Sequence, residues 1–187
     1  MTLSTGKINL IGLSGKKQSG KDAFGKFLRV NVEHSHRLAF GDFVKTEVAE
    51  ACGVPAALIE AKKEMFRPIL QWWGTDFRRD MNGNDYWVEQ LAHAYHYLKN
   101  ETLTVVTDVR FANEAKFIKD NGGLLVRVNR VFGSAADLHR SETSLDGFNF
   151  DLVVDNNGTL EQLKQQADNL IKQYGIHPSE HKQPLQD

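Results

Sequence analysis

Short apolar runs alternate with longer amphipathic stretches along most of the chain. The first run, INLIGL at 8–13, is rich in aliphatic and β-branched residues, which is typical of a strand buried on both faces. The predicted strands are 8–13, 37–40, 103–107, 124–128 and 151–154. Between them, apolar residues recur at helical spacing and define one buried face for each segment. The predicted helices are 20–33, 43–52, 56–81, 85–99, 113–120 and 159–174.

Strands that alternate with helices predict a parallel sheet covered on both faces. We therefore expect one three-layer α/β domain with a five-stranded parallel sheet, spanning residues 1–176. A chain of 187 residues is long enough for a single core that buries roughly 70% of its unfolded surface. The polar stretch at 177–187 contains two prolines and is predicted to be a flexible tail.

Charge and composition exclude several classes of partner. The 23 Lys and Arg residues face 24 Asp and Glu residues, so no positive field draws the chain to a nucleic acid polymer or to a membrane. No apolar run of about 18 residues predicts a membrane span, and the N-terminal residues lack a signal-peptide pattern. We expect a cytoplasmic protein that acts on small molecules. Cys52 is the only cysteine, which excludes an intramolecular disulfide and a cysteine-based zinc cluster.

The strand at 8–13 leads into a glycine-bearing turn that opens the next helix. The turn fits G-x-x-x-x-G-K, and in this strand, turn and helix context the backbone N–H groups and the helix N-terminus converge on phosphate oxygens. This predicts a phosphate-binding loop (P-loop) for ATP, in which Lys21 reaches the outer phosphates. The residues predicted to bind ATP here are Gly15, Lys16, Lys17, Gln18, Ser19, Gly20, Lys21 and Asp22.

Asp22 stands where such loops carry Ser or Thr, whose hydroxyl binds Mg²⁺. A carboxylate also binds Mg²⁺, directly or through water, and it also suits the first turn of a helix. Both interpretations of Asp22 stay open. Mg²⁺ bound with ATP is the expected cofactor, and Asp22 and Asp108 are its candidate ligands.

Polar residues follow two further predicted strands. Asp108 and Arg110 come after the strand at 103–107, where a carboxylate suits Mg²⁺, its water or the acceptor, and a guanidinium suits a phosphoryl group. Glu114 is expected to complement the N-terminus of the following helix. Asp42 and Lys45 follow the strand at 37–40, at the end of a sheet where α/β folds bind ligands.

A polar segment at 130–148 is predicted to be a lid. A lid that excludes water suits phosphoryl transfer because water is a competing acceptor. Arg130 and Arg140 are the candidates to contact the transferring phosphoryl group. The turn after the last strand contains Asn156, Asn157 and Gly158, which favour a tight turn.

GKKQSGKD resembles the loop of the bacteriophage deoxynucleoside monophosphate kinases, which carry G-K-D in place of G-K-S/T. Animal phosphomevalonate kinases share this departure. The block at 66–88, with LQ, GTD and YWV, is similar to the central block of the phage family. The D-x-R at 108–110 and the H-x-S-E at 139–142 also resemble that family, and the likeness extends from Ile8 to about Tyr174.

The resemblance implies a P-loop kinase that transfers the γ-phosphoryl group of ATP to a deoxynucleoside 5′-monophosphate. It implies a helical acceptor-binding region near 42–88, and a guanidinium such as that of Arg67 matches a phosphate bidentately. The implied acceptor-binding residues are Asp42, Lys45, Arg67, Gln71, Trp72, Thr75, Asp76 and Glu142. The resemblance also places the ATP adenine against the turn at 156–158, and a homodimer is compatible with it. Arg78 and Arg79 suit a solvated face as well as a phosphate site.

Two other functions stay open. A kinase of another small metabolite, of the phosphomevalonate or dephospho-coenzyme A type, would share the loop and the lid but not the LQ and GTD block. A nucleotide-binding regulatory protein without transferase activity would bind ATP, and Asp22 followed by Ala23 is the feature that favours it. For the kinase, the expected catalytic residues are Lys21, Asp108, Arg110 and Arg130.

Overall fold

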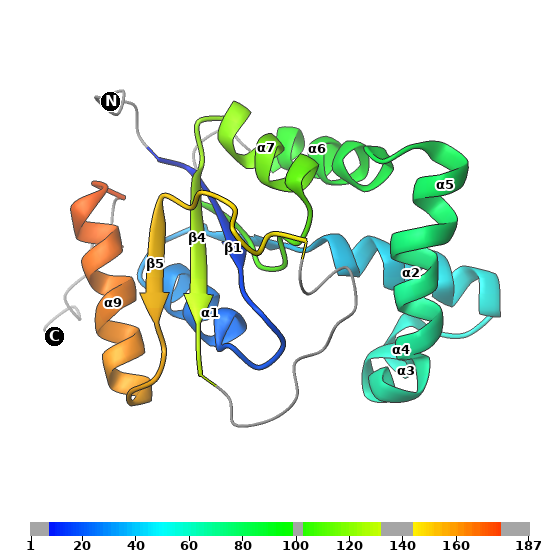
Figure 1. Ribbon diagram of the computed structural model, residues 1–187, viewed down its shortest axis with the longest axis horizontal. Helices are drawn as coiled ribbons and strands as arrows, with labels where there is room; N and C mark the ends of the chain where they lie inside the picture. Colours follow the sequence, from blue (N-terminus) through cyan, green and yellow to red (C-terminus); the bar gives the residue numbers. More distant parts are fainter. Residues whose placement is uncertain (1–7, 99–102, 132–143, 177–187) are drawn as a thin grey trace, which may run out of the picture.

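The computed structural model describes residues 8–98, 103–131 and 144–176, and its centre is a five-stranded sheet (Figure 1). The strands are β1 (Leu10–Ser14), β2 (His36–Leu38), β3 (Thr104–Val106), β4 (Leu124–Asn129) and β5 (Leu152–Asp155). Their order is β2-β3-β1-β4-β5, and every pairing is parallel. The prediction of a five-stranded parallel sheet is confirmed, and the carboxyl ends of β1 and β3 lie side by side.

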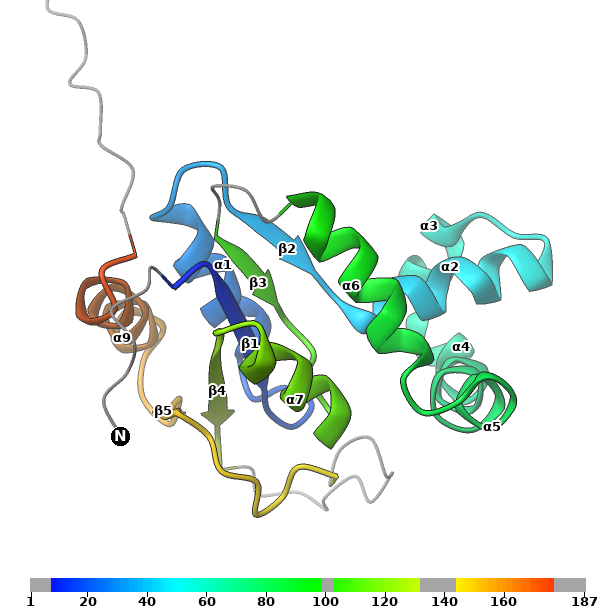
Figure 2. The same ribbon diagram turned by 90° about the horizontal axis from the view of Figure 1, so that it is seen from above.

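Helices cover both faces of this sheet. They include α1 (Lys21–Val30), α2 (Phe40–Cys52), α6 (Tyr86–Leu98), α7 (Ala112–Asp120) and α9 (Leu160–Gln173). Ile11 and Leu13 of β1 pack in one core with α1 and α9, whereas Leu10 packs in a second core with α2, α6 and α7. Figure 2 shows α1 and α9 on one side of the sheet and α6 and α7 on the other. The alternation of β1 side chains between two cores confirms the three-layer arrangement.

Two glycines let helices approach β1 closely. A Cβ at Gly12 would lie 2.7 Å from Ile118 Cγ1 of α7, and a Cβ at Gly25 of α1 would lie 3.0 Å from Leu13 Cδ1. Both distances are too short for an unadjusted contact. The strand that leads into the P-loop is therefore held between α1 and α7, so the loop starts from a fixed point.

The segment 56–81 is not the single helix that its pattern predicts. It is divided into α3 (Ala56–Ala61), α4 (Lys63–Gln71), the π-helix η1 (Trp72–Phe77) and α5 (Arg78–Asn82). The break between α3 and α4 falls at Lys62, whose φ of −115° and ψ of 36° lie outside the helical region. No Gly or Pro stands at this break, so composition gives no signal for it.

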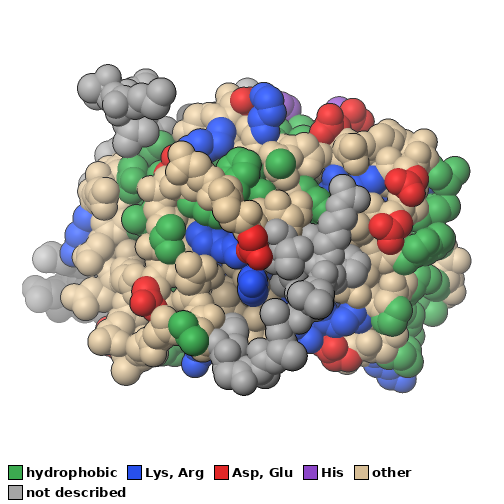
Figure 3. Space-filling model, viewed as in Figure 1, with side chains coloured by type: hydrophobic (Ala, Val, Ile, Leu, Met, Phe, Trp, Pro, Cys, Tyr) green, Lys and Arg blue, Asp and Glu red, His purple; other side chains and the backbone are tan. Residues whose placement is uncertain are grey.

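The helices α3, α4, η1 and α5 form a block beside α2 at one end of the molecule (Figure 1). Met65, Trp72 and Met81 of this block are 63%, 48% and 67% exposed. Figure 3 shows hydrophobic side chains along this edge. Within the described ranges, no helix combines the length and the apolar character needed to cross a bilayer.

Candidate active site

The loop between β1 and α1 turns tightly around the N-terminus of α1. Gly15 and Gly20 have φ angles of 156° and 92°, and a Cβ at Gly15 would lie 2.5 Å from both Ser19 Oγ and Val128 O. Ser19 N donates to Lys16 O over 3.1 Å, which closes the turn. The backbone amides at the start of α1 are thereby oriented as an anion-binding cradle.

Lys21 lies within this loop and is 7% exposed. Its Nζ donates to Lys16 O over 3.4 Å. Among the described residues, the buried Ser19 hydroxyl has no hydrogen-bond partner. The ammonium of Lys21 and the hydroxyl of Ser19 are both hydrogen-bond donors. Both groups suit phosphate oxygens.

A cleft of about 440 Å³ opens between this loop and the helical block. Its walls come from the P-loop, the starts of α2 and α4, η1, and the segment that follows β3. The carboxyl ends of β1 and β3 both contribute to it, as expected for ligand sites in parallel α/β sheets. The loop and the helical block therefore face one common space.

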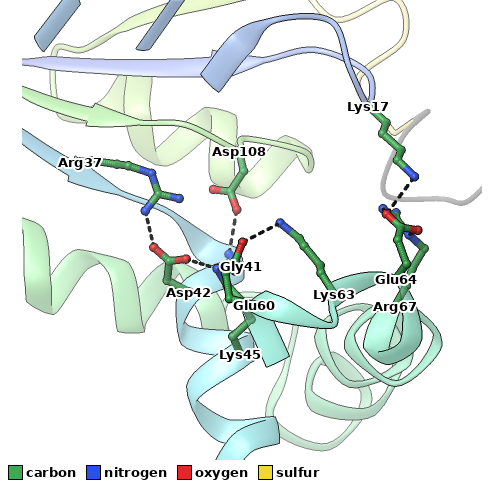
Figure 4. A network of polar contacts seen from close by, with 10 residues as sticks. All are labelled: Lys17, Arg37, Gly41, Asp42, Lys45, Glu60, Lys63, Glu64, Arg67 and Asp108. Carbon is green, nitrogen blue, oxygen red and sulfur yellow. Dashed lines mark hydrogen bonds and ion pairs between the residues drawn. The ribbon is translucent and has the colours of Figure 1, made fainter. Parts of the chain in front are cut away.

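Asp108 joins the end of β3 to the start of α2. Its carboxylate accepts the N–H groups of Phe40 and Gly41, each over 2.8 Å, and Figure 4 shows the contact with Gly41. Burial raises the pKa of the Asp108 carboxyl, and the Gly41 N–H and the Arg110 charge oppose this rise. The two backbone donors hold the carboxylate at the junction of the sheet with the helical block.

Asp42 is the centre of a second charged group, at the start of α2 on the wall of the cleft (Figure 4). Its Oδ2 lies 2.5 Å from Arg37 Nη1, and its Oδ1 lies 2.6 Å from Lys45 Nζ. Lys45 Nζ also lies 2.7 Å from Glu60 Oε2. Burial opposes ionisation of Asp42, but hydrogen bonds from Lys45 and Arg37 hold its pKa below the usual value. The group is therefore fully charged at neutral pH.

Glu64 bridges the two sides of the cleft. Arg67 donates to its carboxylate through Nε and Nη2 over 3.0 and 2.9 Å, and Lys17 of the P-loop donates over 3.3 Å (Figure 4). These hydrogen bonds from Arg67 and Lys17 lower the pKa of Glu64 to about 2. A carboxylate that engages a guanidinium through two parallel bonds has the geometry of a bound phosphate. Glu64 therefore engages the Nε and Nη2 donors of Arg67.

Comparison with known proteins identifies the family. A model of the deoxynucleotide monophosphate kinase family matches residues 45–167. The chain belongs to this family. The match begins in α2, continues through the segment after β3 and ends in α9. The chain is therefore a member of a family of ATP-dependent phosphotransferases.

Individual relatives of the kinase agree with this assignment. A protein of Acanthamoeba polyphaga mimivirus that carries the family name is 31% identical over 180 residues, which cover 84% of this chain and 93% of the relative. The deoxynucleotide monophosphate kinase of Escherichia phage RB69 is 30% identical over 108 residues, 57% of this chain and 44% of the relative. A sugar kinase from Janibacter sp. HTCC2649 has a TM-score of 0.50 at 14% identity, covering 88% of this chain and 95% of that one. This likeness concerns the fold alone, which is that of a P-loop kinase.

Half of the residues predicted for the kinase site meet in the cleft. Those that line it are Lys17, Gln18, Lys21, Asp22, Asp42, Lys45, Arg67, Gln71, Thr75, Asp108 and Arg110. Gly15, Lys16, Ser19 and Gly20 form the remainder of the P-loop. Arg130 follows β4 and is exposed. Glu142, and with it residues 132–143 of the predicted lid, lies outside the described residues.

Trp72 and Asp76 do not line the cleft. Both are exposed, and the ring of Trp72 stacks on Phe77 with centroids 4.8 Å apart. The expectation that Asp76 shares one neighbourhood with Thr75 rests on α-helical spacing, and the sequence predicts Trp72 either in the core or against the base. A π-helix bonds residue i to i+5, and in η1 Thr75 is buried while Trp72 and Asp76 face solvent.

Five charged residues of the cleft were not predicted as site residues: Arg37, Lys63, Glu64, Arg79 and Glu114. Arg79 is 6% exposed and is buried rather than solvated, whereas the neighbouring Arg78 is half-buried. Glu114 does accept the N–H groups at the start of α7, as expected, but it also pairs with Arg79. Burial raises the pKa of Glu114 to about 7, and the Arg79 charge opposes this rise.

The cleft contains groups that suit Mg²⁺. Within the described ranges, no cluster of three or more His, Cys, Asp and Glu could hold a metal by itself. Mg²⁺ in kinases needs few protein ligands, because phosphates and waters complete its shell. Asp22 offers an exposed carboxylate beside Lys21. Among the residues that the structure describes, the buried hydroxyl of Thr107 has no hydrogen-bond partner. Asp108 already accepts two backbone N–H groups, so Asp22 is the better-placed carboxylate.

Asn156, the residue that follows β5, supports the P-loop. It is 7% exposed, and its Nδ2 donates to Ser19 O over 2.8 Å. Asn157 instead bonds Asp155 and the N–H of Val131. Of the three residues at 156–158, Asn156 is thus the one whose side chain touches the loop.

Replacing Asn156 by alanine is expected to destabilise the protein by about 2 kcal/mol and to raise the KM for ATP, because Ser19 O loses a buried donor. Thermal unfolding and ATP titration measure the two effects. Asn121→Ala is the control, since Asn121 donates to Phe117 O over 2.9 Å far from the loop. If the control changes the KM for ATP as much as Asn156→Ala does, the support role is wrong.

Proposed function

We propose that the protein transfers the γ-phosphoryl group of ATP to a deoxynucleoside 5′-monophosphate and so forms ADP and the diphosphate. The observation that carries this proposal is the common cleft, which Lys21 of the P-loop and Arg67 of the helical block both line. Phosphoryl transfer requires a donor and an acceptor phosphate in line within one water-excluding space. Membership of the deoxynucleotide monophosphate kinase family supports this choice of acceptor.

The P-loop holds the donor in this account. Its backbone amides and Lys21 would bind the β- and γ-phosphates of ATP. Asp22, with the Thr107 hydroxyl nearby, would hold Mg²⁺, which neutralises charge on the phosphates when bound. The adenine would lie near the turn at 156–158.

The helical block holds the acceptor. Arg67 and Arg110 would bind its phosphate, and Gln71 and Thr75 offer directional hydrogen bonds to the sugar or the base. Asp42 and Lys45, already charged and paired, complete the acceptor side. Arg130, from the segment predicted as a lid, is proposed to approach the phosphates during transfer, and Glu142 is proposed to bind the acceptor.

No side-chain nucleophile is required. An oxygen of the acceptor phosphate attacks the γ-phosphorus, the bond to the β,γ-bridging oxygen breaks, and ADP leaves. Lys21 and the arginines stabilise the charge that develops on the transferred group. The rate gain comes from alignment and from fixed positive charge.

Glu64 gives a prediction about the acceptor. Glu64→Gln is expected to lower the KM for the acceptor about threefold, because the carboxylate that competes for Arg67 and Lys17 loses its charge. Initial rates against acceptor concentration measure the change. Glu50→Gln is the control, since Glu50 is exposed on α2 and does not line the cleft. A higher KM in Glu64→Gln would instead show that Glu64 assists binding.

The proposed function is tested by ADP release from ATP and Mg²⁺ with each common deoxy- and ribonucleoside monophosphate, beside reactions without acceptor and without Mg²⁺. Release that depends on one or a few deoxynucleotides supports the proposal. Release only with another small metabolite supports a different kinase, and ATP binding without any release supports a regulatory protein.

A further inference from the structure

A buried ion pair lies on the wall of the cleft. It has no role in the phosphoryl transfer proposed for the cleft. Arg79 Nη2 of α5 donates to Glu114 Oε1 of α7 over 2.6 Å, and the two side chains are 4% and 3% exposed. Both residues line the cleft. A buried pair contributes little net stability, because both charges lose their hydration. The role of the pair therefore lies in the segments that it holds in place.

The guanidinium of Arg79 connects three segments of the chain. Nε donates to Gly74 O of η1 over 3.3 Å, and Nη1 donates to Asn84 O before α6 over 2.6 Å. The third bond reaches Glu114 on α7, and Arg79 Cζ lies 4.1 Å from the centre of the Phe111 ring. A lysine has one nitrogen and cannot reproduce this planar set of donors. Arg79 thus fixes η1 relative to α7.

Glu114 in turn holds the backbone from which Arg110 extends. Its Oε2 accepts the N–H groups of Arg110 over 2.7 Å and Phe111 over 3.1 Å. The Arg110 side chain lines the cleft, and its charge acts on the pKa of Asp108. The direction in which Arg110 leaves the backbone therefore depends on Glu114 and, through it, on Arg79.

We propose that Arg79 and Glu114 are positioning residues for phosphoryl transfer, which set the place of Arg110 relative to the η1 wall that carries Thr75. The inference rests on the proposed function. Neither residue needs to touch substrate. A misplacement of about 1 Å in an active site can cost about 100-fold in rate, so disturbing the pair lowers kcat. ATP binding depends on the P-loop between β1 and α1 and is expected to change little.

Arg79→Lys is the first test, because it keeps a positive charge near Glu114 but loses the planar donor set. We expect kcat to fall at least about tenfold while the KM for ATP stays within about twofold. Arg78→Lys is the matched control: the neighbouring arginine bonds Glu47 over 2.6 Å, and neither residue lines the cleft. In this control kcat is expected to stay within about twofold of the wild type.

Loss of folded protein is separated from loss of positioning by expressing kcat per ATP-binding site, with the thermal transition recorded for each variant. Glu114→Gln is the second variant, since it keeps the shape of the side chain and removes its charge. The inference is overturned if the folded variants retain wild-type kcat per site. It is also overturned if Arg78→Lys lowers kcat as much as Arg79→Lys.

Amide hydrogen exchange tests the pair without reference to catalysis. Arg79→Lys is expected to speed exchange of the Arg110 and Phe111 amides at least about tenfold relative to Arg78→Lys. If the wild-type protein transfers phosphate to no deoxynucleotide, the proposed function fails and exchange alone decides. Unchanged exchange then overturns the pair's role, and faster exchange supports it.

Discussion

Lys21→Ala is expected to lower kcat for phosphoryl transfer about 1,000-fold, the scale seen when a preorganised donor to the transition state is removed. Lys21 is the buried ammonium of the P-loop, and its present bond to Lys16 O is a long one of 3.4 Å. Circular dichroism is expected to show a native fold, and single-turnover kinetics to show a slow chemical step.

Lys26→Ala is the control for this variant. Lys26 lies on the same helix, α1, but is exposed and does not line the cleft. Its removal is expected to leave kcat unchanged. Full activity of a well-folded Lys21→Ala protein would show that the P-loop does not take part in phosphoryl transfer.

Arg67→Ala is expected to raise the KM for the acceptor about 100-fold while the KM for ATP changes little. The reason is the loss of a bidentate, charge-assisted bond to the acceptor phosphate, worth about 3 kcal/mol. The geometry for such a bond exists, because Arg67 already holds the Glu64 carboxylate through Nε and Nη2. Initial rates with each substrate varied in turn measure the two constants.

Arg67→Lys provides a graded comparison, since lysine keeps the charge but loses the fork. Its acceptor KM is expected to lie between those of the wild type and Arg67→Ala. An equal rise in both Michaelis constants would place Arg67 outside the acceptor site.

The layers of the fold could be predicted because each strand or helix has its own periodicity. INLIGL at 8–13 overlaps β1, which ends one residue later, and the apolar spacing of 159–174 predicts α9 with a shift of one residue at either end. Local chemistry also reveals the P-loop, since Gly15 and Gly20 are needed where φ is positive. These features depend on short stretches of sequence, which one sequence displays directly.

The rest of the site depends on tertiary contacts that local patterns do not encode. The π-helix at 72–77 changes the register by which Thr75 enters the cleft, and WWGTDF carries no mark of it. The pairing of Arg79 with Glu114 joins residues 35 positions apart. Glu64 likewise finds Lys17 only because α4 packs opposite the P-loop. Such contacts become visible once the elements are placed in space.

In the proposed reaction, one cleft binds ATP and a deoxynucleoside monophosphate, and the γ-phosphoryl group moves from the first to the second. The most direct test is to incubate the protein with ATP labelled with ³²P at the γ-position, Mg²⁺ and each deoxynucleoside monophosphate, and to separate the products. We predict that label appears in a deoxynucleoside diphosphate, at a rate that Lys21→Ala lowers about 1,000-fold. Label that appears only in inorganic phosphate, or remains in ATP with every deoxynucleotide, would contradict it.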